Sequence, residues 1–166
     1  MNRAYRICLI SLLLLSTVGC DQVTKKVAQS GLVSAGPVSL LKDVIILEYA
    51  ENPGAFLSLG ENLPRPILLV FSSLITAGLA VLLVALSMRK REIRVATLVG
   101  LSLIVGGSIG NLIDRLMNGG VVVDFISVGM GAMRSGIFNM ADVALLTGAF
   151  VLLLARGKQS ARAGAT

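Results

Sequence analysis

Long apolar stretches separated by polar connections set the pattern of this chain. Four of them are long enough to predict transmembrane helices, and they lie at about residues 5–22, 66–88, 95–113 and 138–155. The second and third carry no charged residue over 23 and 19 positions, and a membrane helix needs about 20. The first reaches full length only if residues 20–22 continue the helix. We therefore expect a single integral membrane domain over residues 1–166.

Two short runs between these stretches predict strands. Val44–Leu47 is followed by the turn-forming segment Glu51–Gly54, and Val121–Ile126 follows the turn-forming segment Asn118–Gly120. The runs belong to the two long connections, residues 23–65 and 114–137. The expected fold class is an all-α membrane protein with four transmembrane helices and a small β-containing extracytoplasmic loop region.

The composition agrees with a membrane protein and narrows its chemistry. Hydrophobic residues make up 55% of the chain and charged residues 14%, against about 45–50% and about 25% in soluble domains. The chain has no His, which excludes Ser-His-Asp triads and His-ligated metal sites. Its two Cys are too few for a disulfide scaffold or a thiolate metal site. We expect neither a metal nor a cofactor.

The distribution of charge predicts the orientation in the membrane. The connection 89–94 has four basic residues against one acidic, and the tail 156–166 is basic, as is the N-terminus. Residues 21–65 have four basic and five acidic residues. By the positive-inside rule, both termini and the 89–94 connection are cytoplasmic, and the two long connections lie outside. Nucleic-acid binding is not expected, because the basic residues stand in short segments beside the spans.

The N-terminal segment also resembles a lipoprotein signal peptide that ends at Cys20. Thr17 stands where Leu is expected, and three further apolar stretches follow, which is unusual for an exported lipoprotein. We therefore expect the protein to keep its first span and to carry no lipid at Cys20.

Polar side chains gather at one end of the predicted spans. Asn139 and Asp142 stand three residues apart near the start of the last span and share a helix face. Asn111, Asp114 and Arg115 likewise share a face at the end of the third span. Ionisable residues at membrane depth are costly and are therefore functional candidates.

Four aspartates converge at the predicted outer edge of the membrane, namely Asp21, Asp114, Asp124 and Asp142. Two carboxyl groups held close together can share one proton, which provides an acid and a base for activating water without His, Ser or a metal. A catalytic pair of Asp124 and Asp142 is one interpretation, and a polar site for helix packing is another. A third is a small transport subunit with a proton site at Asp142.

Structural roles compete with catalysis at several of these positions. For Asp114 we favour a structural ion pair with the adjacent Arg115 over a role in catalysis. Asp21 and Lys25 stand four residues apart, a spacing that suits either a helix-end ion pair or support of a substrate. The segment Asn52–Gly54 has the composition of a plain turn.

Five motifs together resemble bacterial lipoprotein signal peptidase, also called signal peptidase II. They are Asp21–Lys25, Asn52–Ala55, Gly110–Arg115, Val122–Phe125 and Phe138–Asp142. Their order and spacing fit the family from the first span to the last. The resemblance implies a four-helix aspartic protease of the bacterial inner membrane with its active site at the periplasmic side. Its implied partners are membrane lipid, globomycin-type peptide inhibitors, and diacylglyceryl-modified prolipoproteins, which it cleaves before the lipidated Cys.

The resemblance also implies a role for each matched residue. The catalytic residues would be Asp124 and Asp142. The substrate-binding or supporting residues would be Asp21, Lys25, Asn52, Gly54, Asn111, Asp114, Arg115 and Asn139. One departure is visible, because Phe56-Leu57-Ser58 stands where the family often has Ala-Phe-Ser. It bears on the lining of the outer loop and not on the aspartate pair.

Overall fold

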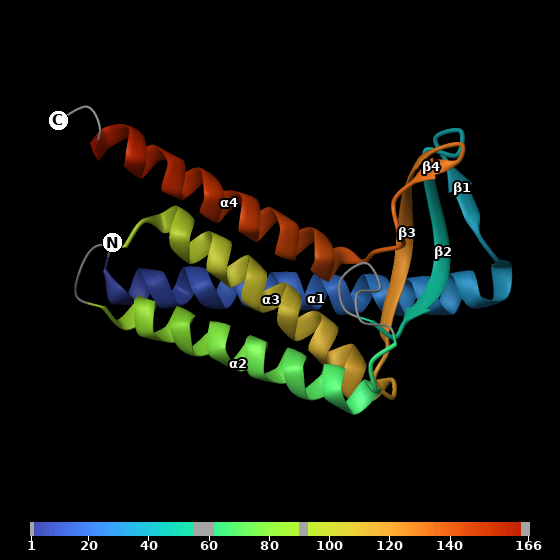
Figure 1. Cartoon of the computed structure of the whole chain (residues 1–166), viewed down its shortest axis with the longest axis horizontal. Helices are drawn as coiled ribbons and strands as arrows, with labels where there is room; N and C mark the ends of the chain where they lie inside the picture. The colour runs from blue at the N-terminus through green and yellow to red at the C-terminus, as the bar shows by residue number, and fades with distance from the viewer. Residues whose placement is uncertain (1, 55–61, 90–92, 164–166) are drawn as a thin grey trace.

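The computed structural model describes residues 2–54, 62–89 and 93–163, and for residues 156–163 only the course of the helix. The described residues form the elements α1 (Arg3–Ala35), β1 (Val38–Leu40), β2 (Ile45–Asn52), α2 (Arg65–Met88), α3 (Val95–Met117), β3 (Val122–Met130), β4 (Met133–Arg134) and α4 (Met140–Ala163). The helices run side by side, and the strands gather at one end of the bundle (Figure 1).

Helix α1 is longer than a membrane crossing requires. Its 33 residues span about 50 Å at about 1.5 Å per residue, against about 30 Å for the hydrocarbon core of a bilayer. It begins after Asn2, whose Oδ1 accepts a hydrogen bond from the Tyr5 N–H at 2.8 Å, and ends at Gly36, which has a φ of 80°. Residues 23–35, which were predicted as part of an outer connection, are therefore helical. Hydropathy shows only the part of a helix that lies within the membrane, and this helix continues beyond that part until it ends at Gly36 and Pro37.

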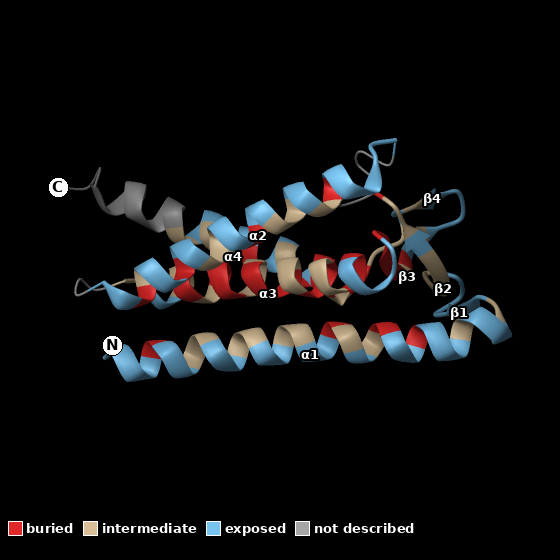
Figure 2. Ribbon diagram, turned by 90° about the horizontal axis from the view of Figure 1, so that it is seen from below, coloured by how far each residue is buried: buried red, intermediate tan, exposed pale blue. Residues whose placement is uncertain are grey.

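Helix α3 is the centre of the bundle. It packs against α1, α2 and α4, and it has more buried residues than any other helix (Figure 2). Glycines let α1 approach it closely, since a Cβ on Gly106 would lie 2.9 Å from the Thr17 Cβ. A Cβ on Gly110 would lie 2.5 Å from the Asp21 Oδ2. Any larger residue at Gly110 would therefore displace the Asp21 carboxylate.

The helices present apolar side chains both inward and outward. The buried core consists of Leu83, Leu98, Leu101 and Val105. Large exposed apolar side chains on the outer faces include Leu15, Leu74 and Leu153. By length and composition α1, α2 and α3 are able to cross a membrane, and α4 has a shorter apolar segment, Met140–Ala155. The protein is therefore mostly helical, with three long apolar helices and a small sheet.

The sheet is antiparallel, with the strand order β1-β2-β3-β4. Leu47 pairs with Ile126 and Asn52 with Val122, and the register shifts between Leu47 and Ala50. Strands β2 and β3 confirm the two runs that the sequence predicted as strands, and each strand begins one residue after the start of its run, at Ile45 and Val122. Strands β1 and β4 were not predicted, because three and two residues are too few to show an alternating pattern.

Phe138 connects the sheet to α4. Its N–H donates to the Ile126 carbonyl at 2.9 Å, and its own carbonyl accepts from the N–H groups of Phe125 and Ile126 at 3.1 and 2.9 Å. Helix α4 begins two residues later. The first turn of α4 is therefore fixed against the middle of β3.

Candidate active site

Asp142 is held by the N-terminal cap of α4. Its backbone N–H donates to the Asn139 Oδ1 at 3.0 Å, and the Asn139 N–H donates to the Asp142 Oδ2 at 3.2 Å. This reciprocal pattern between the cap residue and the third helical residue is a capping box, here built from Asn and Asp. The spacing of three residues noted in the sequence therefore has a local cause, and it fixes the direction of the Asp142 carboxylate.

Asp124 approaches the same asparagine from β3. Its Oδ1 accepts a hydrogen bond from the Asn139 Nδ2 at 2.6 Å, and its Oδ2 accepts one from the Asn52 Nδ2 at 2.9 Å. Asn139 thus contacts both aspartates, which come from different elements. Asp124 and Asp142 are only 2% and 5% exposed, and Asn139 is fully buried. The structure brings the two predicted catalytic residues together.

The environment of Asp124 favours its protonated form. The pKa of this carboxyl is raised to about 6, mainly by burial and also by the negative charge of Asp142, although the hydrogen bonds from Asn52 and Asn139 and the charge of Lys25 lower it. A carboxyl group with this pKa exchanges protons readily near neutral pH, as a general acid or base must.

Asn111 stands behind the aspartates on α3 and links them to a charged cluster. Its Nδ2 donates to the Asp142 Oδ1 at 3.0 Å. Its Oδ1 accepts from the Lys25 Nζ and from the Asn139 Nδ2, both at 3.0 Å. Because the ammonium group of Lys25 can only donate, it determines which end of the Asn111 amide faces Asp142.

The charged cluster consists of Lys25, Asp21 and Asp114, all nearly inaccessible to solvent. The Lys25 Nζ lies 2.8 Å from the Asp21 Oδ2 and 2.9 Å from the Asp114 Oδ2. The predicted pair of Asp21 and Lys25 is confirmed. The expected partner of Asp114 was wrong, since this carboxylate pairs with Lys25 and not with Arg115. Residues adjacent on a helix do not face one another, which is the physical reason.

Each aspartate of the cluster also holds a backbone group of another element. The Asp21 Oδ1 accepts from the Ala141 N–H at 2.9 Å, so α1 caps the second residue of α4. The Asp114 Oδ2 accepts from the Val123 N–H at 2.9 Å, directly before Asp124 in β3. The cluster therefore positions the backbone beside both predicted catalytic residues.

Arg115 secures the turn after β2. Its Nη2 donates to the Gly54 carbonyl at 2.8 Å, and its Nη1 donates to the Asn111 carbonyl at 3.3 Å. The Gly54 N–H donates to the Asn52 Oδ1 at 2.9 Å, which closes an Asx turn. The predicted turn at Asn52–Gly54 is confirmed, and it carries the amide that contacts Asp124. The departure at Phe56-Leu57-Ser58 lies outside the described residues.

Gln22 was not predicted as a site residue. Its Nε2 donates to the Asp114 Oδ1 at 2.9 Å, and to the Asp21 Oδ2 and the Gly110 carbonyl at 3.2 Å each. An amide next to Asp21, at the end of an apolar span, was the signal that could have identified it. Its contacts bridge the two acids of the charged cluster.

A groove of about 190 Å³ reaches this site between α2, α3 and α4. Its polar side is formed by Asn111, Arg115 and Asp142. The apolar lining includes Leu68, Phe71, Ile75 and Leu145. Sequence reasoning missed the contribution of α2 because its apolar residues carry no chemical signature. Within the described residues no group of three or more His, Cys, Asp or Glu side chains has the arrangement of a metal site.

Comparison with known proteins identifies the family. The family described as signal peptidase (SPase) II matches residues 13–156. The lipoprotein signal peptidase of Chlorobium phaeovibrioides is 36% identical over 155 residues, which cover 88% of each chain. That of Pelotomaculum thermopropionicum is 34% identical over 132 residues, which cover 80% of each chain.

Solved structures agree with this match. A bacterial membrane enzyme determined by the in meso method at 2.3 Å resolution has a TM-score of 0.80 and 26% identity, and the match covers 94% of this chain and 92% of that one. A second such enzyme, at 1.9 Å resolution, has a TM-score of 0.73 and 27% identity, with 90% and 92% covered. The chain thus belongs to the signal peptidase II family, the lipoprotein signal peptidases.

Proposed function

We propose that this protein is an aspartic endopeptidase that removes signal peptides from diacylglyceryl-modified prolipoproteins and cleaves before the lipidated Cys. The aspartic mechanism is supported by the hydrogen bonds of Asn139, whose side-chain amide donates to Asp124 and whose backbone N–H donates to Asp142. Membership of a peptidase family favours this function over proton transport at Asp142.

The proposed chemistry uses one proton shared by the two carboxyl groups. The ionised carboxylate accepts a proton from a water molecule as the water oxygen attacks the scissile carbonyl carbon, and the other carboxyl group donates its proton to the carbonyl oxygen. The tetrahedral intermediate then breaks its C–N bond as the protonated carboxyl group gives its proton to the leaving nitrogen. One hydroxyl group of the intermediate returns its proton to the ionised carboxylate, which restores the single shared proton. The raised pKa of Asp124, about 6, supports a proton being held there near neutral pH.

The remaining polar residues keep this pair in place. Asn111 orients the Asp142 carboxylate, and Asn52 orients that of Asp124. Lys25, Asp21 and Asp114 act through the backbone and through Asn111 and are positioning residues. Arg115 and Gly54 hold the outer turn over the site, where substrate backbone would pass.

The groove between α2, α3 and α4 is the proposed entry for the signal peptide. Its apolar wall suits the apolar part of a signal peptide, and its polar end contains Asp142. In the proposed topology α4 is the fourth span, although its apolar segment Met140–Ala155 is short. The N-terminus would be cytoplasmic and the sheet periplasmic, in the inner membrane, because the basic residues concentrate at the opposite end from the sheet. The diacylglyceryl chains of the substrate would then remain in bilayer lipid.

Cleavage of a lipidated prolipoprotein by the purified protein tests this proposal. Asp124→Asn and Asp142→Asn should each abolish cleavage, and the double variant should be no worse than either, because the two groups act as one unit. Asp43→Asn is the matched control, since Asp43 is an exposed aspartate between β1 and β2 whose φ of 66° Asn tolerates well. This control should cleave at the normal rate.

Globomycin should inhibit the unmodified protein in the same assay. Near-normal cleavage by Asp124→Asn would refute the proposed pair, and it would point to Asp114 as the partner of Asp142. Because each replacement keeps the size of the side chain, insertion into the membrane fraction should be unchanged, and it is measured alongside.

A further inference from the structure

A second cavity lies in the half of the bundle away from the sheet, between α1, α2 and α3. Its volume is about 340 Å³, within the range of ligand pockets, roughly 300–1,000 Å³. The walls are mainly apolar and include Ile7, Leu14, Leu83, Val105 and Ile109. None of the residues assigned to the candidate active site lines it.

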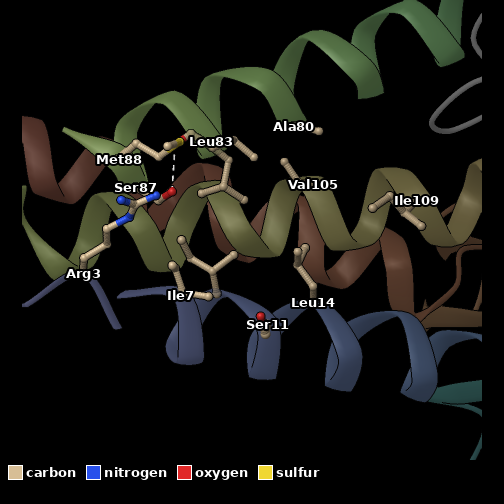
Figure 3. Close-up of a pocket in the computed structure, with 12 residues that line it drawn as sticks. Arg3, Ile7, Ser11, Leu14, Ala80, Leu83, Ser87, Met88, Val105 and Ile109 are labelled. Atoms are coloured by element: carbon tan, nitrogen blue, oxygen red, sulfur yellow. Dashed lines mark hydrogen bonds between the residues drawn. The ribbon is translucent and has the colours of Figure 1, made fainter. Parts of the chain in front are cut away.

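The end of this cavity near the chain terminus is polar and basic. Arg3 and Ser87 lie beside one another there, with Ile7, Leu14 and Val105 further along (Figure 3). The Ser87 hydroxyl donates to the Val84 carbonyl at 2.8 Å. Arg3 is exposed, and it has no acidic partner among the residues that the structure describes. A positive charge thus stands at the mouth of an otherwise apolar cavity.

Two further arginines lie near this mouth. The Arg6 Nη1 donates to the Arg89 carbonyl at 2.9 Å, which brings the first turns of α1 to the end of α2. Arg3, Arg6 and Arg89 thus bring three basic residues to this end of the bundle. A basic pocket between transmembrane helices at the membrane surface is suited to an anionic lipid headgroup.

The length of the cavity fits one leaflet of a bilayer. Arg3 and Leu14 are eleven positions apart on α1, which is about 16 Å along the helix at about 1.5 Å per residue. Half of the hydrocarbon core is about 15 Å thick. An acyl chain that starts beside Arg3 therefore reaches the middle of the bilayer at the depth where the cavity ends.

We propose that this cavity binds one acyl chain of an anionic phospholipid, with the phosphate group paired to Arg3. A signal peptide is not the occupant, because its basic N-terminal segment would be repelled by the same positive charge. The site lies apart from the aspartate pair, so the proposal does not depend on the proposed catalytic mechanism.

Binding of defined lipids to the purified, detergent-solubilised protein tests this proposal. Native mass spectrometry gives the apparent dissociation constants for dioleoyl phosphatidylglycerol and dioleoyl phosphatidylcholine. We expect the anionic lipid to bind at least about five-fold more tightly, since one basic residue near a membrane surface contributes about 1 kcal/mol. Arg3→Gln should weaken phosphatidylglycerol binding about five-fold and phosphatidylcholine binding less, because the choline cation already neutralises the phosphate of that lipid.

Arg89→Gln is the matched control, because it removes the same charge from the same end of the bundle without altering the lining of the cavity. It should change phosphatidylglycerol binding by less than about two-fold. An equal loss in both variants would mean general attraction to a basic surface and would overturn the proposal. Equal binding of the two lipids by the unmodified protein would also overturn it.

A second pair of variants tests the position of the acyl chain. Ser11 lines the cavity from α1 and is exposed, so Ser11→Phe fills the space without disturbing the helical core. It should weaken binding of both lipids several-fold, whereas Ser11→Ala should not. Unchanged binding in Ser11→Phe would refute a chain in this cavity. An unchanged circular dichroism spectrum verifies that each variant is folded.

Discussion

Replacing Lys25 with Met removes the only cation from a cluster that contains two buried carboxylates. Lys25 is 3% exposed, and its ammonium group lies within 2.9 Å of both Asp21 and Asp114. The variant Lys25→Met keeps the length of the side chain and leaves both acids without their counterion. It also removes one of the two donors to the Asn111 Oδ1, the other being the Asn139 Nδ2.

The expected loss follows from the burial of the cluster. Breaking a buried ion pair by removing one partner costs about 3–5 kcal/mol. For a chain of this size, 1 kcal/mol corresponds to about 2–4 °C in the midpoint of thermal unfolding, so the midpoint should fall by roughly 6–20 °C. The hydrogen bonds from Ala141 and Val123 to the two acids remain, which favours the lower part of this range.

Circular dichroism in detergent measures the midpoint, because thiol-reactive dyes would react with the exposed Cys8 and Cys20 before unfolding. Lys26→Met is the matched control, since the neighbouring Lys26 is exposed. The double variant of Lys25→Met with Asp114→Asn should recover part of the loss, because one buried carboxylate then remains instead of two. A loss in Lys25→Met no larger than that in Lys26→Met would refute the reasoning. Turnover should also fall in Lys25→Met at temperatures where it is folded, because the Asn111 amide that contacts Asp142 is then held by the Asn139 Nδ2 alone.

Three further predictions concern protonation, the N-terminus and topology. The pKa of Asp124 is about 6 in the folded state against about 3.9 when unfolded. The stabilisation that comes from the protonated Asp124 carboxyl is therefore complete below about pH 4 and is lost as the pH rises through about 6. The thermal midpoint of Asp124→Asn, relative to that of the unmodified protein, should rise between pH 4 and pH 7, and a constant difference would contradict this. Cys20→Ala should leave insertion and cleavage unchanged, and the intact mass of the unmodified protein should show no acyl groups and no start at Cys20. Alkaline phosphatase fused after Gly60 should be active, and fused after Arg91 inactive; the reverse pattern would place the aspartates on the wrong side of the membrane.

The parts of the site that the sequence predicted well are those with a local cause. Asn139 and Asp142 lie three residues apart in the chain, and the capping box that joins them needs only the first turn of α4. The pairing of Asp21 with Lys25 follows from helical spacing in the same way. Strands β2 and β3 could be predicted because each apolar run has turn-forming residues close to one of its ends.

The parts that the sequence missed depend on contacts between distant segments. Lys25 and Asp114 are far apart in the sequence, and they meet only because Gly110 lets α1 approach α3. The cap that Asp21 provides to Ala141 joins the first helix to the last. The apolar lining of the groove required the position of α2, which hydropathy alone does not supply. Spacing along the chain cannot show which of several acids a buried lysine will pair with.

The division of the two aspartates between a helix and a strand has a consequence for how the site forms. The Asp142 carboxylate is oriented by the cap of α4 and by Asn111 of α3, whereas the Asp124 carboxylate obtains both of its hydrogen bonds from outside β3, from Asn139 and Asn52. The side chain of Asn139 therefore brings the pair together only when the sheet has docked on the bundle. Docking is secured by Asp114 through the Val123 N–H and by Arg115 through the Gly54 carbonyl. Both residues follow Asn111 within the last turns of α3, so one helix end holds the sheet, the outer turn and the Asp142 carboxylate in a single arrangement.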